Sequence, residues 1–333
     1  MKLKRARNSL LNISKLPPEL LGDIFCRNAT FKGDFGGFWK RSRNFLLVCH
    51  HWFEVASSTP EVWSFWGNTP KDWARLHQRS GSAPLDLVLS AEWDDGSFDA
   101  ELSNVLQDRA TQDTIRRIHL KATDSRLLKS IISSLTTDSK ELRSSGVESF
   151  MLENGGSGGL VDISDFFAHY HFPRLQRLEF YNCMISSWNL ITSRIATLTI
   201  LDLDFFTIEP TPTTSQVLSI LASNPTLRKV AFSVDVTSAD DGDVTPPPRV
   251  PLRHLKELKL DGHLQGIFGI LDRLDLPRDV DILDITLDEC AVEAFHKPSA
   301  HAFETTFGIV AYLSLDWGFP FPPSLTSNSK LVM

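Results

Sequence analysis

The residues best placed for chemistry lie at 155–159, where Gly155, Ser157 and Gly159 satisfy the G-x-S-x-G pattern of a hydrolase nucleophile elbow. A serine on such a turn attacks carbonyl carbons when a base is near, and aspartates and histidines follow between 162 and 171. Four glycines around one serine are equally typical of a flexible loop, and the chain has no H-G-G-G segment to supply an oxyanion hole. We therefore predict that this segment is a loop and that the chain is not an enzyme.

Other groupings of polar residues resemble metal sites only superficially. His50 and His51 follow Cys49, but neighbours on a helix point about 100° apart and do not converge as metal ligands do. The acidic stretch 240–243 lacks the ligand spacing and the final Glu of a calcium loop. The four cysteines lie far apart without a C-x-x-C pair. We predict no metal, no cofactor and no disulfide framework.

Composition narrows the class of protein. The chain has 333 residues and a formal charge of −7, which argues against a general nucleic-acid binder. Its apolar runs are far shorter than the roughly 18 residues that cross a membrane, and no apolar stretch follows the basic N-terminus. We expect a soluble protein of the cytoplasm, the nucleus or both, without membrane or nucleic-acid partners. The basic residues at 2–7 fit either a nuclear signal or a solubilising tail.

The elements that position these residues follow a repeated frame, Leu-x-x-Leu-x-Leu with other apolar residues allowed, at intervals of roughly 23 to 32 residues. The first residues of the frames are Ile115, Val147, Leu175, Leu198, Leu227, Leu255, Ile282 and Val310. Apolar residues at helical spacing lie between frames, for example at 163–170 and 267–274, and the segment 84–89 precedes the first frame as a candidate capping strand. The pattern predicts an α/β leucine-rich-repeat solenoid of strand-helix units, whose stacking supplies the core.

Residues 13–66 follow a different pattern. Pro17 and Pro18 fit the first turn of a helix that Ser14 can cap, and an apolar stripe follows to residue 25. A second helix is predicted over about 43–57, and it ends at Thr59 because Pro60 disfavours helical backbone at the residue before it. So short a helical segment has too little core for an independent enzyme.

These residues resemble the F-box, in the form abundant in mushroom-forming fungi. The resemblance rests on Leu16-Pro17-Pro18-Glu19-Leu20-Leu21-x-x-Ile24-Phe25 and on Val48-Cys49-x-x-Trp52-x-x-Val55-Ala56-x-x-Thr59-Pro60-x-Val62-Trp63. It implies a small helical bundle that docks on the adaptor subunit of a cullin-RING ubiquitin ligase, while the repeats hold the protein to be ubiquitinated. The residues that the resemblance assigns to the adaptor contact are Leu16, Pro17, Leu20, Ile24, Phe25, Leu46, Val48, Cys49 and Trp52.

One departure from the family pattern is the segment from Asn28 to Asn44, which is longer than the usual connection between the two helices. Its glycines favour a flexible loop, and its aromatic residues fit a local satellite core or an added contact. A loop that folds over the apolar stripe would block docking. The alternative function is then a repeat scaffold that binds proteins without ligase activity.

Within each frame, the fifth and seventh residues alternate with the buried ones and are predicted to line the exposed face of the sheet. Acidic residues outnumber basic ones at these positions, which would attract a basic partner segment or merely keep the face soluble. The residues predicted to bind the substrate are Met151, Glu179, Tyr181, Asp202, Asp204, Asp261, Asp288 and Asp316.

The predicted organisation is therefore a basic tail at 1–12, an F-box-like module at 13–66, and a linker with the cap of the array at 67–114. Leucine-rich repeats occupy 115–320, and a tail completes the chain at 321–333. The function that we expect is substrate recognition for a cullin-RING ubiquitin ligase.

Overall fold

The computed structural model describes the chain in segments. They are residues 15–29, 44–66, 73–91, 113–122, 125–126, 128–129, 132, 146–155, 160–169, 172–188, 195, 197–204, 211–233, 236, 249–287 and 314–315. The chain divides into two compact units, residues 1–159 and 160–333, and this boundary falls within the segment predicted as repeats. None of the helices in these segments combines the length and the apolar character needed to cross a bilayer.

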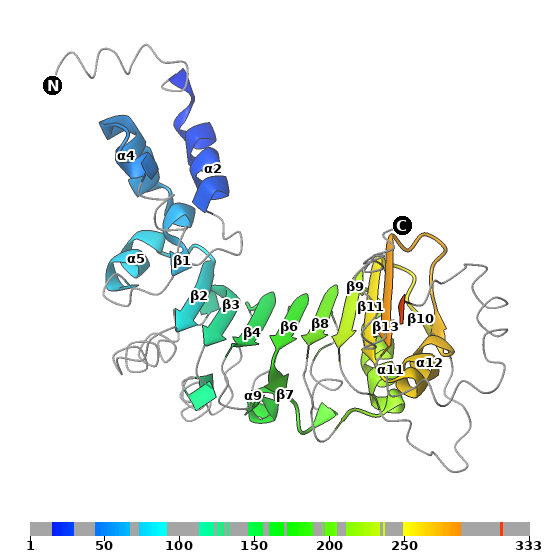
Figure 1. The fold of residues 1–333 in the computed structure, drawn as a ribbon. Helices are drawn as coiled ribbons and strands as arrows, with labels where there is room; N and C mark the ends of the chain where they lie inside the picture. The colour runs from blue at the N-terminus through cyan, green and yellow to red at the C-terminus, as the bar shows by residue number, and fades with distance from the viewer. Residues whose placement is uncertain are drawn as a thin grey trace, which may run out of the picture. The chain divides into compact units, whose positions relative to one another are not determined.

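The first unit begins with helices (Figure 1). Helix α2 spans Pro18–Ala29, and α4 spans His50–Ser58 after a separate helical turn at 44–46. The predicted second helix is thus interrupted at Cys49. This residue has extended backbone, with φ of −161° and ψ of 171°, and occupies the N-cap position of α4. Helix α4 ends before Thr59 and Pro60, as predicted. A 3-10 helix, η2, at Pro60–Trp63, the short strand β1 at Phe65–Trp66 and helix α5 at Trp73–Ser80 complete this part.

Three longer strands of the first unit form a parallel sheet. Strand β2 at Leu85–Ala91 forms where a capping strand was predicted, and it pairs with β1 on one side and with β3 at Ile115–Ala122 on the other. Strand β4 at Ser149–Asn154 continues the order, with Ile118 opposite Phe150 and Leu120 opposite Leu152. The predicted frames therefore lie in register in this unit.

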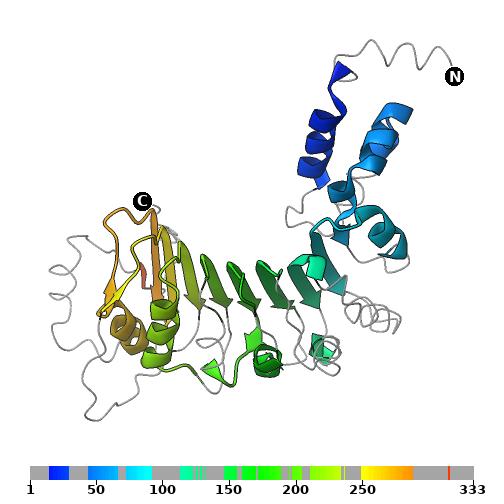
Figure 2. The ribbon, with the colours of Figure 1, turned by 180° about the vertical axis from the view of Figure 1, so that it is seen from behind.

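The second unit repeats this arrangement, and Figure 2 shows its frame strands between residues 177 and 287 side by side from green to orange. The strands, paired parallel in chain order, are β6 (Arg177–Tyr181), β8 (Ile200–Asp204), β9 (Lys229–Ser233), β11 (Glu257–Gly262), β13 (Ile282–Leu287) and β14 (Ser314–Leu315). Separate two-stranded sheets join β5 (Val161–Asp162) to β7 (Cys183–Met184) and β10 (Val250–Pro251) to β12 (Leu274–Asp275). These parallel, unclosed sheets confirm the predicted α/β class.

The register corrects one predicted frame. Leu258 and Leu260 of β11 pair with Leu283 and Ile285 of β13, so the frame in β13 starts at Val280 and not at Ile282. A shift of two residues keeps the same side chains on the same face, and for this reason the apolar pattern alone did not distinguish the two registers. The exposed fifth position of this strand is therefore Asp284.

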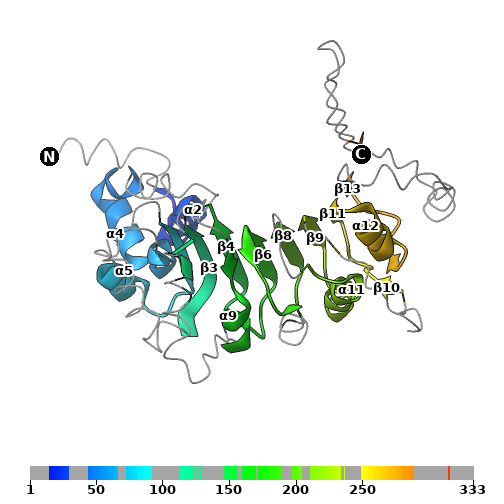
Figure 3. The same ribbon diagram turned by 60° about the horizontal axis from the view of Figure 1, so that its bottom comes forward.

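Helices and recurring side-chain hydrogen bonds connect successive strands. Helix α9 spans Ser164–His169, α11 spans Thr214–Ser223 and α12 spans Leu264–Leu271, and α11 and α12 pack side by side (Figures 1 and 3). The Thr197 hydroxyl donates to the Leu175 carbonyl at 2.7 Å, and the Thr226 hydroxyl donates to the Leu198 carbonyl at 2.8 Å. Each threonine precedes the first residue of its frame. The same backbone geometry therefore recurs from one strand to the next.

The core of the second unit lies between the frame strands and these helices. Strands β6, β8, β9 and β11 bury the apolar residues of their frames, and Leu201, Val230 and Leu258 are all 0% exposed. The frame residues of β13 are only half-buried. Asn224 is also fully buried, and it satisfies two backbone groups: its Oδ1 accepts from the Leu198 amide, and its Nδ2 donates to the Ile220 carbonyl. A buried amide with both functions paired stabilises the turn between α11 and β9.

Candidate functional site

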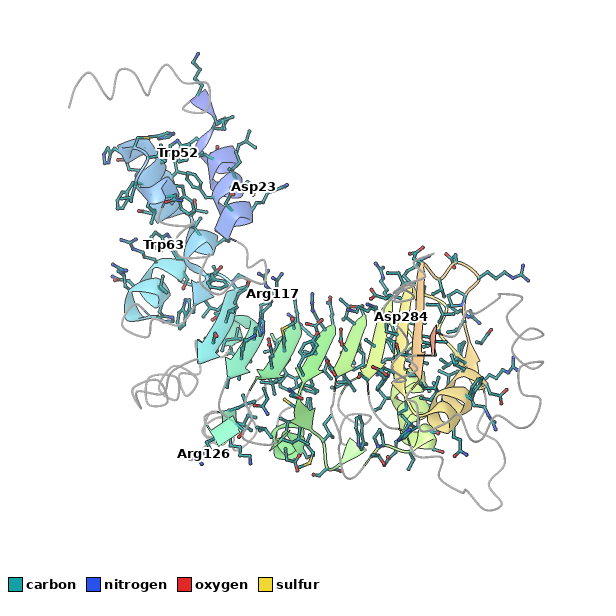
Figure 4. All side chains as sticks on the ribbon, in the orientation of Figure 1. Asp23, Trp52, Trp63, Arg117, Arg126 and Asp284 are labelled. Atoms are coloured by element: carbon teal, nitrogen blue, oxygen red, sulfur yellow. The ribbon has the colours of Figure 1, made fainter. Side chains whose placement is uncertain are left out.

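The helical module has an aromatic interior. The rings of Phe25 and Phe45 stack at 4.6 Å between centroids, and Trp52 lies 5.2 Å from Phe25, between α4 and α2 (Figure 4). The Trp63 indole donates to the Ala56 carbonyl at 2.7 Å, and the guanidinium of Arg79 lies 4.2 Å from the Trp63 ring. These contacts fix α2, α4 and η2 against one another.

Apolar side chains also lie on the outside of this module. Of the large apolar residues that are exposed in the described segments, all but Ile282 belong to it. They are Leu20 at 54%, Ile24 at 37%, Leu47 at 82%, Val48 at 50% and Phe53 at 42%. We call these five residues the exposed apolar set. Isolated exposed apolar residues are ordinary, but their concentration in one small module is typical of an interaction surface.

The residues predicted to contact the adaptor differ in their exposure. Leu20, Ile24, Val48 and Pro17 are exposed, whereas Leu16, Leu46, Cys49 and Trp52 are half-buried. Phe25 is 1% exposed and belongs to the aromatic interior. Sequence reasoning did not select Leu47 and Phe53, although both are exposed. Residues 30–43 of the long predicted loop lie outside the described residues.

The second candidate site is one surface of the sheet in the second unit. It is formed by the residues that alternate with the buried frame residues along each strand. We call it the charged face. It comprises Arg177, Glu179, Tyr181, Ile200, Asp202, Asp204, Lys229, Ala231, Ser233, Glu257, Lys259, Asp261, Ile282, Asp284 and Thr286. The strand register places Tyr181, Asp204, Ser233 and Asp261 in one row across four neighbouring strands.

Ion pairs neutralise part of this face. Arg177 lies 2.8 Å from the Glu179 carboxylate, and Lys229 lies 3.0 Å from that of Asp202. Lys229 and Lys259 also approach Glu257, at 3.9 and 3.5 Å. Six carboxylates and three cations make up the face, so a negative excess remains after pairing.

The predicted exposure of Glu179 and Asp202 is wrong in degree. Both lie on the charged face, yet Glu179 is 1% exposed and Asp202 is 9% exposed, because longer neighbouring side chains lie against them. Tyr181, Asp204 and Asp261 are half-buried, and Asp284 is exposed and projects from β13 (Figure 4). Sequence reasoning missed Asp284 because of the shifted frame.

Titration behaviour reflects this crowding. Burial, followed by the charges of Glu179 and Asp202 and a hydrogen bond to Asp202, raises the pKa of Tyr181 far above its usual value. Burial and the neighbouring Asp202 charge also raise the pKa of Asp204, although the polar hydroxyl of Ser233 on the next strand opposes them. Burial alone would lower the pKa of Lys229, but the hydrogen bond and charge of Asp202 raise it overall. The face is thus an acidic environment that favours positive charge.

The remaining predicted substrate residues fall elsewhere. Met151 belongs to the first unit, where it is half-buried on β4 opposite His119 of β3. Asp288 and Asp316 lie outside the described residues, as do Ser157 and the acidic stretch 240–243.

Reactive or metal-binding groups are scarce in the described segments. His50 Nε2 lies 3.1 Å from Glu54, and no group of three His, Cys, Asp or Glu side chains in those segments could hold a metal ion. Burial, with the charges of Glu61 and Asp23, raises the pKa of Cys26 to about 11, so this thiol stays protonated at neutral pH.

Comparison with known proteins adds no family assignment. No protein-family model matches this chain, and a search of curated proteins gives no match either.

Proposed function

We propose that this chain is the substrate-recognition subunit of a cullin-RING ubiquitin ligase. Its helical module is an F-box that docks on the adaptor subunit, and its strands and helices form a leucine-rich-repeat solenoid that binds the target protein. The resemblance of residues 16–63 to the F-box supports this proposal, together with the parallel frame strands that follow.

The observation that carries the proposal is that α2 is apolar on two sides. Leu21 is 0% and Phe25 is 1% exposed, so one stripe of the helix fills the interior of the module. Leu20 and Ile24 lie one turn apart on a second stripe and remain exposed. A surface helix of a globular protein needs a single apolar stripe to face its own core. The second stripe is therefore available to a partner, and the F-box resemblance identifies that partner as the adaptor.

The test is co-precipitation of a recombinant adaptor subunit with the full chain carrying Leu20→Asp and Ile24→Asp together. Two carboxylates in a desolvated contact cost several kcal/mol, whereas a micromolar complex is held by only about 8 kcal/mol. Co-precipitation should therefore fall below detection. Both side chains are exposed, so the double variant should keep the melting temperature of the wild type within a few degrees.

A matched control carries Ser219→Asp and Ala222→Asp on the exposed side of α11. It adds the same two charges on a helix of the second unit, and it should bind the adaptor like the wild type. Undiminished co-precipitation by the folded Leu20/Ile24 variant would remove the exposed stripe from the docking contact. A folded wild-type chain that does not bind the adaptor would refute ligase function and favour the alternative of a repeat scaffold.

A further inference from the structure

The charged face contains a buried carboxylate oxygen that lacks a donor. Glu179 is 1% exposed; its Oε1 pairs with Arg177, whereas its Oε2 has no hydrogen-bond partner in the described residues. A buried acceptor without a donor is costly, and such groups in native proteins are commonly satisfied by a ligand, an ion or water. Glu179 lies opposite Asp202 of the next strand, and its charge helps to raise the pKa of Tyr181.

The neighbouring strands bring further carboxylates around short side chains. Ala231 and Ser233 of β9 lie between Asp202 and Asp204 on one side and Lys259 and Asp261 on the other. Asp204 and Asp261 lie on strands that are two positions apart in the sheet, so their backbones are separated by about 9.6 Å at the usual strand spacing. Ser233 lies between them and donates to Asp261 at 3.3 Å. Charged residues thus flank the two short side chains, with carboxylate acceptors on both sides.

The spacing decides which kind of cation fits. A metal ion needs three or more ligands that converge on one point, and no such group exists in the described segments. A guanidinium carries donors along two edges of a plane and can reach carboxylates that are several ångströms apart. The half-buried ring of Tyr181, in the same row as Asp204, offers a further surface for a cation.

We propose that the charged face binds an arginine-rich segment of a partner protein, with a guanidinium seated over Ser233 between Asp204 and Asp261. The negative excess of the face draws the segment in, and the carboxylates of Asp204 and Asp261 accept its donors. The buried carboxylates of Glu179 and Asp202 add negative potential beside this seat. The proposal rests on the proposed function in one respect: the partner is then the protein that the ligase recognises.

The test uses fluorescence anisotropy of a labelled octa-arginine peptide with the purified full chain at 0.05 M NaCl, in the absence of the adaptor. One variant carries Asp204→Asn and Asp261→Asn, which keep shape and remove two charges from the face. The matched control carries Asp272→Asn and Asp275→Asn, which remove two charges from exposed positions at the end of α12 and in β12. Both variants have the same net charge, so any difference between them comes from position.

The face variant should bind with a Kd at least about tenfold higher than that of the wild type, and the control should stay within about twofold. Raising the salt to 0.3 M should weaken the wild type by a larger factor than the face variant, because screening then acts on fewer charges. Absent binding by the wild type, or equal losses in the two variants, would overturn the proposal. Adaptor docking is tested separately, by co-precipitation of variants in the first unit. Failure of peptide binding is therefore distinguishable from failure of the proposed ligase function.

Discussion

At the scale of single residues, some carboxylates of the charged face lie in surroundings that lower the stability of the folded chain. Asp204 is crowded by Asp202, and one oxygen of Glu179 receives no hydrogen bond from the part of the chain that the structure describes. Stability alone would select neutral or paired residues at these positions. Proteins commonly retain such residues where binding requires them, at a cost in stability.

This interpretation predicts the stability of Asp204→Asn. Burial and the charge of Asp202 raise the folded pKa of Asp204 above the unfolded value of about 3.9. The folded chain therefore binds this proton more tightly, and ionisation of Asp204 removes stability as pH rises from about 4 through the folded pKa. Asn cannot ionise, so the variant should be more stable than the wild type at pH 7, by less than about 1 kcal/mol.

Urea unfolding at pH 7 and at pH 4 checks this, since the advantage of the variant should shrink toward zero at the lower pH. A variant that is less stable than the wild type at pH 7 would mean that the carboxylate is stabilising where it lies. The stabilising substitution should at the same time contribute to the loss of peptide binding.

At the scale of elements, the frames predicted most strands because each strand must bury alternate residues, and that requirement is visible in the sequence. The pattern did not determine the register of β13, where Ile282, Ile285 and Leu287 satisfy the frame as well as Val280, Leu283 and Ile285 do. Strand pairing decides between them, and the partner strand is distant in sequence.

Helices were harder to predict than strands. The strand-helix unit predicts a helix before β9, but the bounds of α11 were not predicted, although Thr213 and Gln216 form a reciprocal capping box with bonds of 3.2 and 3.0 Å, a signal present in the sequence. The burial of Glu179 and Asp202 had no such signal. It depends on cross-strand and same-strand neighbours, Lys229 and Arg177, whose positions follow from the register and from side-chain packing.

Two glycines of α12 test how closely this helix packs. A Cβ on Gly266 would lie 2.4 Å from the Val236 carbonyl oxygen, which is backbone and cannot turn aside. A Cβ on Gly269 would lie 3.3 Å from the side chain of Thr214, which can give way. Either alanine gains up to about 1 kcal/mol of helix propensity. Gly266→Ala should nevertheless lose about 1 to 3 kcal/mol through strain, whereas Gly269→Ala should be neutral or stabilising.

Thermal unfolding of both variants measures the difference, and each serves as the control of the other because the chemical change is identical. Equal effects at the two positions would contradict the close approach of α12 to Val236.

At the scale of the whole molecule, the two candidate surfaces belong to different compact units. The exposed apolar set lies in residues 1–159 and the charged face in residues 160–333. Each unit has its own buried apolar residues, among them Phe25 and Phe150 in the first and Leu201 and Val230 in the second. In the repeat array that we propose, stability is approximately a sum of local and nearest-neighbour contributions, so damage in one part need not unfold the rest.

This organisation predicts that the two proposed binding activities can be separated by a single core substitution. Leu201 is 0% exposed in the middle of β8, and Leu201→Asp would bury a charge without a partner, at a cost of several kcal/mol. The second unit should unfold, and binding of octa-arginine should disappear. Adaptor co-precipitation should persist, because the aromatic interior around Phe25 is untouched. Lys259→Asp, on the exposed side of β11, is the control that places an aspartate where water reaches it. Loss of adaptor binding by Leu201→Asp, with the control unaffected, would show instead that the two units fold cooperatively, so that the helical module needs an intact second unit to stay folded.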